Sequence, residues 1–477
     1  MIVSSCKFPE NKFAIIPLHS LIPTDEQLKV FNSPPPGVRK IIISTIIAET
    51  SITINDVVFV IDCGKVKIKN FNFKLNIETL ESVWISKANA SQRKGRVGRV
   101  KPGKCFHLMT RARYETLEPY MCPEILRSRL ENVLLTAKVL QLGKIGDFFP
   151  RLMDAPDPGA IAVSLDLLKR LEALDENESL TPLGYHLAKL PMNPQIGKML
   201  LFGAIFNCLQ PILNIAIILE YKDPFIIPFR KENEAIWKKQ EFGRNCKSDH
   251  LFMNKLVLKF QNLNEFKREQ FCSEFFLNLQ TMTHILKLKR EFMQHLYEMG
   301  FVPNLNPKCI ECNSNSYRLD VLRAIICAGL YPNIVYIGKL ENKVALFQLL
   351  NDDQVSLHPK SVLIGKYIRN PLLVYYKLIK STNVFIHDAT PVDSLHVLFF
   401  GDNFQIGSEG EHHFITISNT LKFTSIKSTA EVIKELRDKL NKFLEYKISH
   451  PSVVDLREEN EETLLLRTIV ALLDKKQ

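Results

Sequence analysis

The chain has 477 residues, enough for about three domains, and a hydrophobic content of 46% that is ordinary for globular proteins. Its formal net charge of +11 favours a polyanionic partner, although charge alone leaves nucleic acid, an anionic membrane and simple solubility open. Ten cysteines without a spaced framework, and no signal peptide at residues 1–11, argue against a disulfide-stapled secreted protein and for an intracellular one, cytoplasmic or nuclear.

The first part of the chain has the pattern of a parallel α/β domain. Two strand-like apolar runs, residues 41–44 and 57–61, are joined by a segment rich in hydroxyl side chains, and a basic helix follows. Because the loops of such domains work at the strand ends, we expect the functional side chains to lie there.

A basic helix is predicted over residues 92–99, which read Q-R-K-G-R-V-G-R. Gln92, Arg96 and Arg99 are spaced by four and three residues, so one helical face would carry all three. Two planar guanidinium groups and an amide beside glycines suit a triphosphate. The alternative is a solvated basic helix face, which is what most such octamers are.

Two segments together carry a family resemblance. A-E-T-S-I-T at residues 48–53 and Q-R-K-G-R-V-G-R at 92–99 resemble motifs V and VI of DEAH-box helicases of superfamily 2, in order and in spacing. The resemblance implies ATP hydrolysis with Mg²⁺ between two RecA-like domains, this chain holding the second. It assigns catalysis to Gln92, Arg96 and Arg99, nucleotide binding to Phe31, Ser51, Thr53 and Asn55, and an RNA contact to Thr45.

The sequence departs from the family pattern at two positions. Ile46 stands where the family usually has asparagine, and it offers no polar contact. Asn55 stands where a ribose-side aspartate is usual, and it keeps hydrogen-bonding capacity without the charge. Both departures weaken the expectation that this copy binds ATP and RNA in the usual way.

The motifs of a first RecA-like domain, G-x-x-x-x-G-K-[ST] and D-E-x-H, do not occur in a suitable context. Residues 98–105 fit the first pattern except at Cys105, but they precede a predicted strand, whereas a phosphate-binding loop opens a helix. We therefore expect the C-terminal half of a longer enzyme, or a truncated gene product. Such a chain would hold no metal itself, and it would be inactive without the first domain, which holds most of the Mg²⁺ ligands.

Residues 65–85 alternate basic and apolar side chains and predict a β-hairpin with a basic face. The family resemblance implies that this hairpin is a wedge against a duplex and that Lys65 and Lys67 contact RNA. The alternative is an edge hairpin kept soluble by its lysines.

A helical pattern follows from about residue 123 to residue 300. Residues 123–191 resemble the winged-helix domain of the family, and the following segment resembles its helical ratchet bundle. The apolar run 199–219 is interrupted by polar residues and by Pro211, so we interpret it as two buried helices and expect no membrane span.

The last third predicts a helix at 319–328 and then a small OB-fold barrel. The expected strands are residues 334–340, 344–350, 372–379, 384–389 and 395–400. L-H-P-K-S-V at 357–362 resembles the OB domain of the family and places His358, Lys360 and Ser361 at the RNA channel, with a merely structural turn as the alternative. Two amphipathic helices from Thr429, broken at Pro451, would cap this barrel.

These elements predict a multidomain α/β, α and β chain. Its domains are a second RecA-like domain (1–116), a winged helix (117–191), a ratchet bundle (192–316), an OB-fold (317–428) and a helical extension (429–477). The implied function is that of a monomeric 3′-to-5′ helicase portion that binds single-stranded RNA or DNA and unwinds duplexes. Residues 84–96 most resemble the G-quadruplex-resolving branch, which adds G-quadruplexes to the substrates. A non-catalytic RNA-binding protein and a membrane-surface protein are the alternatives.

Overall fold

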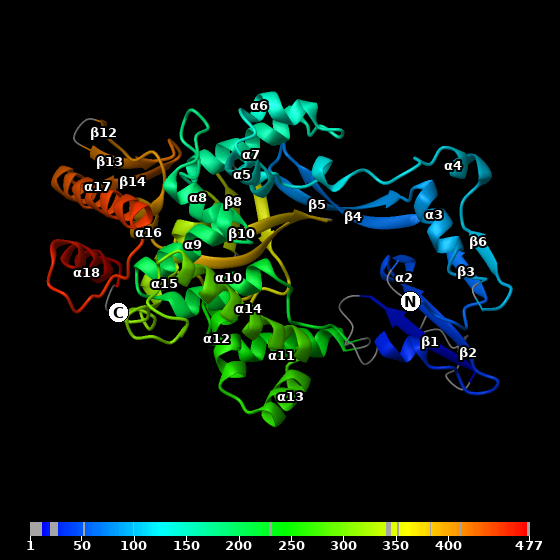
Figure 1. Cartoon of the computed structure of the whole chain (residues 1–477). Coiled ribbons are helices and arrows are strands. Elements are labelled where there is room, and N and C mark those ends of the chain that lie inside the picture. Colours follow the sequence, from blue (N-terminus) through cyan, green and yellow to red (C-terminus); the bar gives the residue numbers. More distant parts are fainter. Residues whose placement is uncertain are drawn as a thin grey trace.

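The computed structural model of the chain describes residues 12–19, 27–50, 53–98, 100–228, 231–339, 345–350, 353–381, 383–409 and 412–474. Ser51 and Arg99, both assigned above to the nucleotide site, lie outside these ranges. The RecA-like elements form one end of the molecule, and a long hairpin connects them to the helices and barrel of the other end (Figure 1).

The RecA-like part confirms the predicted parallel arrangement. Two parallel strand pairs are formed, β1 (Phe13–Leu18) with β2 (Arg39–Ser44) and β3 (Phe59–Asp62) with β6 (Lys104–His107). The strand predicted after residue 104 is present as β6. The glycine-containing segment before it therefore leads into a strand and does not open a helix, as a phosphate-binding loop would. The short helix α2 (Ile47–Thr50) follows β2 directly.

The basic helix α3 (Lys87–Lys94) is shorter than predicted. Ser86 caps its start by accepting from the Asn89 backbone N–H, and Gly95 caps its end. Gly98 has a φ of +77°, in the left-handed region that glycine adopts without strain. Because the helix ends at Lys94, Arg96 lies in the following turn, and the prediction of one helical face shared with Gln92 is wrong.

The predicted hairpin is confirmed as β4 (Lys65–Asn72) paired with β5 (Ile77–Trp84). The sequence did not predict that β5 also pairs in parallel with β10 of the barrel, Ile379 opposite Glu78. The hairpin thus extends the barrel sheet, and the basic strand β4 is its outer edge. Figure 1 shows it spanning the two ends of the molecule.

The winged-helix part confirms the leucine periodicity. Leu130, Leu134 and Leu168 are fully buried, and a single bridge joins Leu174 to Leu180. The helices are α5 (Glu131–Val139), α6 (Ile145–Phe148), α7 (Pro158–Arg170) and α8 (Pro182–Lys189). Asp157 and Thr181 cap α7 and α8, each followed by a proline in the first helical turn, where no backbone N–H is needed.

The apolar run 199–219 forms two buried helices, as predicted. The chain turns between them at Asn207, whose φ is +53°, and Pro211 lies in the first turn of the second, where helices tolerate proline. The ratchet bundle consists of α9 (Pro194–Ile205), α10 (Leu209–Glu220), α11 (Glu232–Phe242), α12 (Asp249–Gln261), α13 (Glu265–Glu274) and α14 (Leu279–Glu298). Across the described ranges, none of the helices combines the length and the apolar character that crossing a bilayer requires.

The OB-fold is confirmed as a closed barrel of five strands, preceded by the predicted helix α15 (Leu319–Leu330). Its strands are β7 (Ile334–Lys339), β8 (Ala345–Leu349), β9 (Gln354–Leu357), β10 (Leu372–Lys380) and β11 (Val384–Val392). The prediction of a strand at 395–400 is wrong, because this segment is helix α16 (Ser394–Phe400). A capping box between Asp393 and His396 starts the helix, and its apolar side chains pack against α15.

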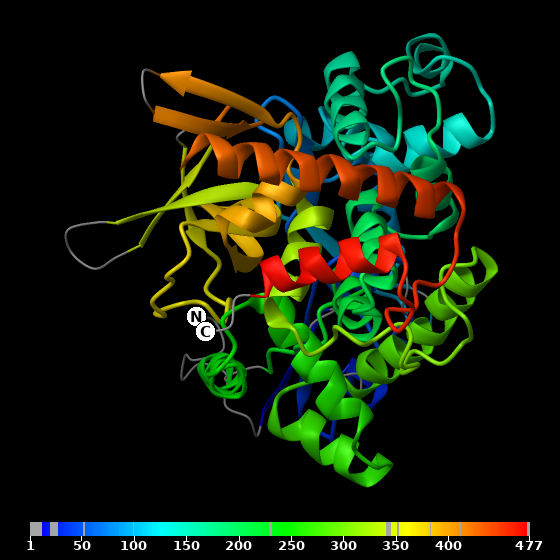
Figure 2. The same cartoon turned by 90° about the vertical axis from the view of Figure 1, so that its left-hand side faces the viewer.

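The tail confirms two helices, α17 (Lys427–Ser449) and α18 (Glu461–Leu473). A three-stranded antiparallel sheet that the sequence did not predict precedes them, formed by β12 (Gln405–Glu409), β13 (His412–Ile417) and β14 (Leu421–Ser425). The main neighbours of the tail are α8, α15, α16 and β13, so it covers helices beside the barrel and the expected barrel cap is wrong. Figure 2 shows both helices crossing this face.

Candidate functional site

A cavity of about 860 Å³, here called the RecA pocket, lies between the parallel strand pairs. It brings Thr45, Thr53 and Arg96 together with Lys65 and Lys67 of the hairpin. Lys40, Asp56 and Arg93 line it as well.

The other residues predicted for the nucleotide site lie apart from the lining. Phe31, Gln92 and Asn55 are exposed, and none of the three lines the RecA pocket. Their contacts to nucleotide therefore stay predictions. Ile46 lines the pocket with half of its side chain exposed, so an apolar surface stands where the family usually has an amide.

A buried ion network holds the two motif helices together. Arg93 donates from Nε to Glu49 Oε2 at 2.8 Å and from Nη1 to Asp62 Oδ1 at 2.7 Å. Asn89 of the same helix also donates to Glu49. Glu49 and Asp62 are both 3% exposed, so both carboxylates depend on these donors. The network joins α2, which follows Thr45, to α3, which precedes Arg96.

Asp62 stays ionised in this network despite its burial. Burial alone would raise its pKa, but hydrogen bonds from the Gly64 N–H, from Arg93 and from His107 outweigh it and lower the pKa. His107 Nδ1 lies 3.0 Å from Asp62 Oδ2. The guanidinium charge of Arg93 is thereby neutralised by two carboxylates.

Sequence reasoning missed two residues of the RecA pocket. Arg93 follows Gln92 directly, but its partners lie 44 and 31 residues away, a distance that no local pattern reveals. Asp56 forms an ion pair with Lys40 at 2.6 Å and lines the pocket. The carboxylate that Asn55 lacks is therefore present one residue later, and a search around that position would have found it.

The donors of the RecA pocket fit part of a nucleotide. Arg96 and the hydroxyl groups of Thr45 and Thr53 suit phosphate and ribose oxygens. Mg²⁺ prefers several oxygen ligands, and the described residues contain no group of three or more His, Cys, Asp or Glu side chains that could hold a metal ion. The donors of the RecA pocket thus fit the phosphate side of ATP.

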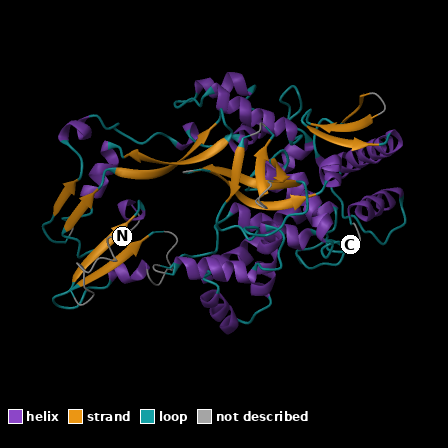
Figure 3. Cartoon of the chain, turned by 180° about the vertical axis from the view of Figure 1, so that it is seen from behind, coloured by secondary structure: helices purple, strands orange, loops and turns teal. Residues whose placement is uncertain are grey.

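The basic strand β4 borders two cavities. Lys65 and Lys67 line the RecA pocket, and Lys69 lines a second cavity of about 350 Å³. The Lys65 amine lies 3.6 Å above the Trp84 ring, which fixes the root of the hairpin. Figure 3 shows the hairpin bridging the RecA-like part and the barrel from the opposite side.

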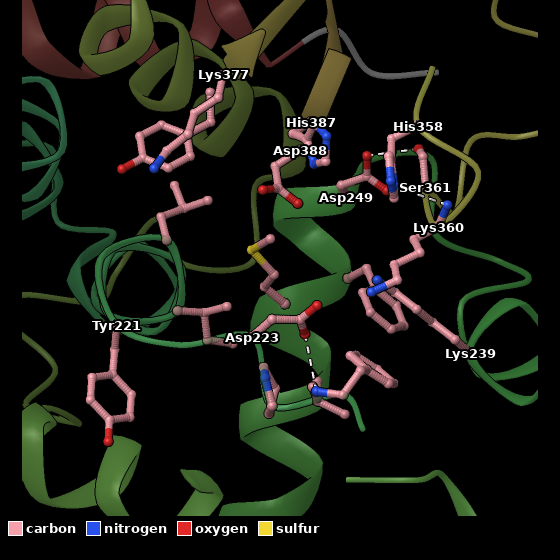
Figure 4. Close-up of a pocket in the computed structure, with 18 of the residues that line it drawn as sticks. Tyr221, Asp223, Lys239, Asp249, His358, Lys360, Ser361, Lys377, His387 and Asp388 are labelled. Carbon is pink, nitrogen blue, oxygen red and sulfur yellow. Dashed lines mark hydrogen bonds between the residues drawn. The ribbon is translucent and has the colours of Figure 1, made fainter. Parts of the chain in front are cut away.

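The second cavity, here called the hairpin pocket, lies where the hairpin, the ratchet bundle and the barrel meet. His358, Lys360 and Ser361 line it together, as Figure 4 shows, and their contact to RNA stays a prediction. Further polar side chains that line it are Lys69, Tyr221, Asp223, Lys239, Asp249, Lys377, His387 and Asp388.

Asp249 ties the OB-fold to helix α12. Its carboxylate accepts from Ser361 Oγ at 2.7 Å, from the Val362 N–H at 2.8 Å and from the Ala389 N–H at 3.0 Å. Ser361 Oγ also accepts from the Leu363 N–H at 3.1 Å. The hydroxyl of Ser361 is thus engaged inside the protein, and its contact to phosphate stays a prediction.

Burial keeps the histidines of the hairpin pocket neutral. It lowers the pKa of His387 to about 3, helped by His358 and by nearby lysines, and it lowers the pKa of His358 as well. The two rings lie 4.2 Å apart, centroid to centroid. The positive charge of this pocket therefore comes from its lysines.

Asp388 has the opposite shift. Burial, followed by the charge of Asp249, raises its pKa to about 7, while Lys239 opposes the shift. Its φ of +56° is unusual for a side-chain-bearing residue and points to a backbone held by its surroundings. The charge of the hairpin pocket thus changes near neutral pH.

Family profiles match most of the chain. The helicase conserved C-terminal domain matches residues 2–101, and the helicase-associated winged-helix and ratchet-like domains match 164–192 and 193–253. The oligonucleotide/oligosaccharide-binding OB-fold matches 322–404, and the C-terminal domain in RNA helicases matches 413–475.

Similar proteins cover the chain from end to end. It is 42% identical over 489 residues to the ATP-dependent DNA/RNA helicase DHX36 of Homo sapiens, covering 100% of the chain and 48% of that protein. The DHX36 of Mus musculus is 44% identical over 95% of the chain and 46% of that protein. The DExH-box ATP-dependent RNA helicase DExH1 of Arabidopsis thaliana is 39% identical over 93% of the chain and 44% of that protein. The chain spans about half the length of the curated relatives that it matches.

Proposed function

Because the chain belongs to the DEAH-box helicases, as their C-terminal half, we propose that it is the part of an ATP-dependent 3′-to-5′ helicase that grips single-stranded nucleic acid and couples the grip to nucleotide state. ATP, bound with Mg²⁺ mainly by a first RecA-like domain, would supply the energy of stepping. The residues of this chain would sense the phosphates and hold the strand.

The observation that carries this proposal is the row of lysines on β4. Alternate residues of a strand share a face, so Lys65, Lys67 and Lys69 form a row about 13 Å long. One end of the row lies in the RecA pocket and the other in the hairpin pocket. A polyanionic strand that follows this row would pass from the phosphate-sensing side of the molecule to Lys360 of the OB-fold.

The coupling would run through Glu49. Thr45, proposed to touch the nucleic-acid backbone, lies just before α2, and Arg96, proposed to touch phosphate, lies just after α3. The contacts of Asn89 and Arg93 with Glu49 join these two helices. Closure of the cleft on ATP would move α3, and this network would carry α2 and Thr45 with it. A rigid ion network suits this task, because it transmits displacement between the two motifs.

The names of the DHX36 relatives, DNA/RNA helicases, support both nucleic acids as substrates. We extend the proposal to duplexes and G-quadruplexes, on the likeness of residues 84–96. A non-catalytic RNA-binding role is the alternative, favoured by the apolar Ile46 at the RecA pocket. RNA binding without ATP hydrolysis, in a protein that also holds a first RecA-like domain, would support that alternative.

Replacing Lys67 and Lys69 by alanine tests the lysine row. Both amines lie on the exposed edge strand, so their loss removes charge with little effect on folding. We expect the slope of log affinity against log salt, measured by anisotropy of a labelled single-stranded RNA, to fall by about 1.4, which is about 0.7 per lost phosphate contact.

Lys434 and Lys442, exposed on α17, supply the matched control for the lysine row. Their double alanine variant has the same change in net charge and should keep the original slope. Equal slopes for the two double variants would contradict the proposed path.

The affinity for RNA should fall as the pH rises from 6 to 8. Asp388, whose pKa is raised to about 7, is neutral below that pH and carries a negative charge above it, where it opposes phosphate. Among the charged residues that line the hairpin pocket with Asp388 are Lys239, Lys377, Asp223 and Asp249. His387, whose pKa is about 3, does not titrate between pH 6 and pH 8. One negative charge, several ångströms from a phosphate in a solvent-filled pocket, lowers the affinity for RNA by about fivefold.

Asp388→Asn should remove this pH dependence and keep the affinity near its value at pH 6. The measurement is the same anisotropy titration, repeated at pH 6, 7 and 8 for both proteins. A parallel decline in the variant and the unaltered chain would assign the effect to another group.

A further inference from the structure

A third cavity lies on the side of helix α12 that faces away from the hairpin pocket. This outer groove, of about 1580 Å³, is bordered by α12, by the start of α15 and by the OB-fold segment 363–370. α12 presents Phe252, Met253 and Leu256 to the hairpin pocket but Lys255 and Lys259 to the outer groove. The two cavities are therefore separated by the thickness of one helix.

The outer groove is strongly basic. Seven cationic side chains line it, namely Lys247, Lys255, Lys259, Arg318, Arg323, Lys366 and Arg369, against three carboxylates, Asp320, Asp393 and Asp474.

The carboxylates of the outer groove are already engaged. Arg323 Nη1 lies 2.7 Å from Asp320 Oδ1, Arg318 pairs with Asp474, and Asp393 accepts from Asn370 Nδ2 at 2.8 Å.

The other five cations, four lysines and Arg369, form no ion pair with any residue in the described ranges. Lys255 and Lys366 donate to backbone carbonyl oxygens, which leaves their charge unneutralised. The groove therefore offers a net positive charge to whatever enters it.

Two tyrosine rings stand exposed in the same groove. Tyr317 is 73% and Tyr367 is 84% exposed, one beside α15 and the other on the OB-fold segment. Nucleobases stack on such rings whatever their identity, and lysines beside the rings hold the backbone. An acidic peptide would satisfy the lysines but would leave both rings uncovered.

We propose that the outer groove is a second binding site for single-stranded nucleic acid, separate from the path along β4. Its lysines would bind phosphates, and Tyr317 and Tyr367 would each stack one base. The Asp249 contacts to Ser361 and Val362 hold the chain directly before the OB-fold segment 363–370. This site goes beyond the proposed helicase path, because it needs neither the hairpin nor the RecA pocket.

Photochemical cross-linking tests the proposal on the 477-residue chain. A single-stranded RNA carrying 4-thiouridine is irradiated with the chain, and the cross-linked peptides are identified by mass spectrometry. We expect cross-links at Tyr317 and Tyr367, and we expect them to persist in the variant with Lys67→Ala and Lys69→Ala, which weakens only the hairpin path. Loss of the tyrosine cross-links in that hairpin variant would overturn the second site.

Two variants of the outer groove sharpen the test. In the hairpin variant background, Tyr367→Ala should weaken the remaining RNA binding by about tenfold, the effect of one lost stack. Lys247→Glu with Lys259→Glu should weaken it further at low salt, whereas Lys434→Glu with Lys442→Glu, of equal charge change, should leave it unchanged. If the two double glutamate variants weakened RNA binding equally, the effect would come from overall charge and not from the outer groove, which would overturn the proposal.

An acidic peptide is the competing occupant of the outer groove. A polyglutamate peptide should compete with RNA only weakly there, because it cannot replace base stacking. Binding of polyglutamate that requires Lys247 and Lys259, without any RNA cross-link at the two tyrosines, would assign the groove to a protein partner instead.

Discussion

We expect ATP hydrolysis to fall by on the order of 10³-fold when Arg96 is replaced by alanine in a protein that unites this chain with a first RecA-like domain. Arg96 lines the RecA pocket together with Thr45 and Thr53. The neighbouring cations Lys40 and Arg93 are held by carboxylates at 2.6 to 2.8 Å, so they serve the fold. We propose that the guanidinium of Arg96 meets the charge that develops on the phosphate.

The measurement for Arg96 is the rate of phosphate release at saturating RNA. Lys94→Ala is the matched control, since Lys94 is exposed, ends helix α3 two residues before Arg96 and should keep the full rate. RNA affinity without nucleotide should stay unchanged in the Arg96 variant, which shows that the fold is intact. More than a tenth of the original rate in the Arg96 variant would remove it from the catalytic site.

Arg99, to which the family resemblance also assigns a catalytic role, lies outside the described residues, so its role stays a prediction. Arg99→Ala in the same assay gives the second measurement of this group. Loss of hydrolysis in both variants would indicate two guanidinium groups that act together on the phosphates.

We expect the replacement of Arg93 by alanine to lower the free energy of unfolding of the RecA-like part by about 3 to 5 kcal/mol. The substitution leaves Glu49 and Asp62 buried without their cation, and breaking such a pair costs more than the pair contributed. Among the described residues, the apolar cluster beside α3 is small, formed by Ile85, Ala90 and Leu117, so it offers little compensation. Arg93→Lys should recover part of the loss, because one ammonium cannot bridge both carboxylates as a guanidinium does.

Unfolding of the RecA-like part can be followed separately. The chain has two tryptophans, and in a Trp237→Phe background Trp84 reports on the root of the hairpin and on α3 beside it. Urea titrations of Arg93→Ala and of the control Arg111→Ala should differ clearly, since the Arg111 pair with Glu115 is exposed and contributes little. An unchanged midpoint for Arg93→Ala would show that the network adds no stability.

Sequence patterns predicted the elements that local chemistry determines. The alternation at residues 65–85 gave the hairpin, and the polar breaks in 199–219 gave two helices. The predictions from hydrophobic periodicity failed at two places where a helix cap determines where a helix begins or ends. The run 395–400 reads as a strand until the Asp393 capping box is considered, and the motif helix ends at Gly95 instead of continuing through Arg96.

Long-range contacts were beyond the sequence for a physical reason. The pairing of β5 with β10 joins residues some 300 positions apart, and no local propensity encodes a partner at that distance. The bridge of Arg93 between Glu49 and Asp62 belongs to the same class. Both matter for function, because the first connects the two candidate cavities through the hairpin and the second connects the two motifs.

The most direct test of the proposed function is RNA-stimulated ATP hydrolysis by the 477-residue chain, measured alone and as one protein with a first RecA-like domain. We expect no hydrolysis above background from the chain alone and RNA-stimulated hydrolysis from the united protein. Hydrolysis by the chain alone, or none by the united protein while it still binds RNA, would contradict the proposed helicase function.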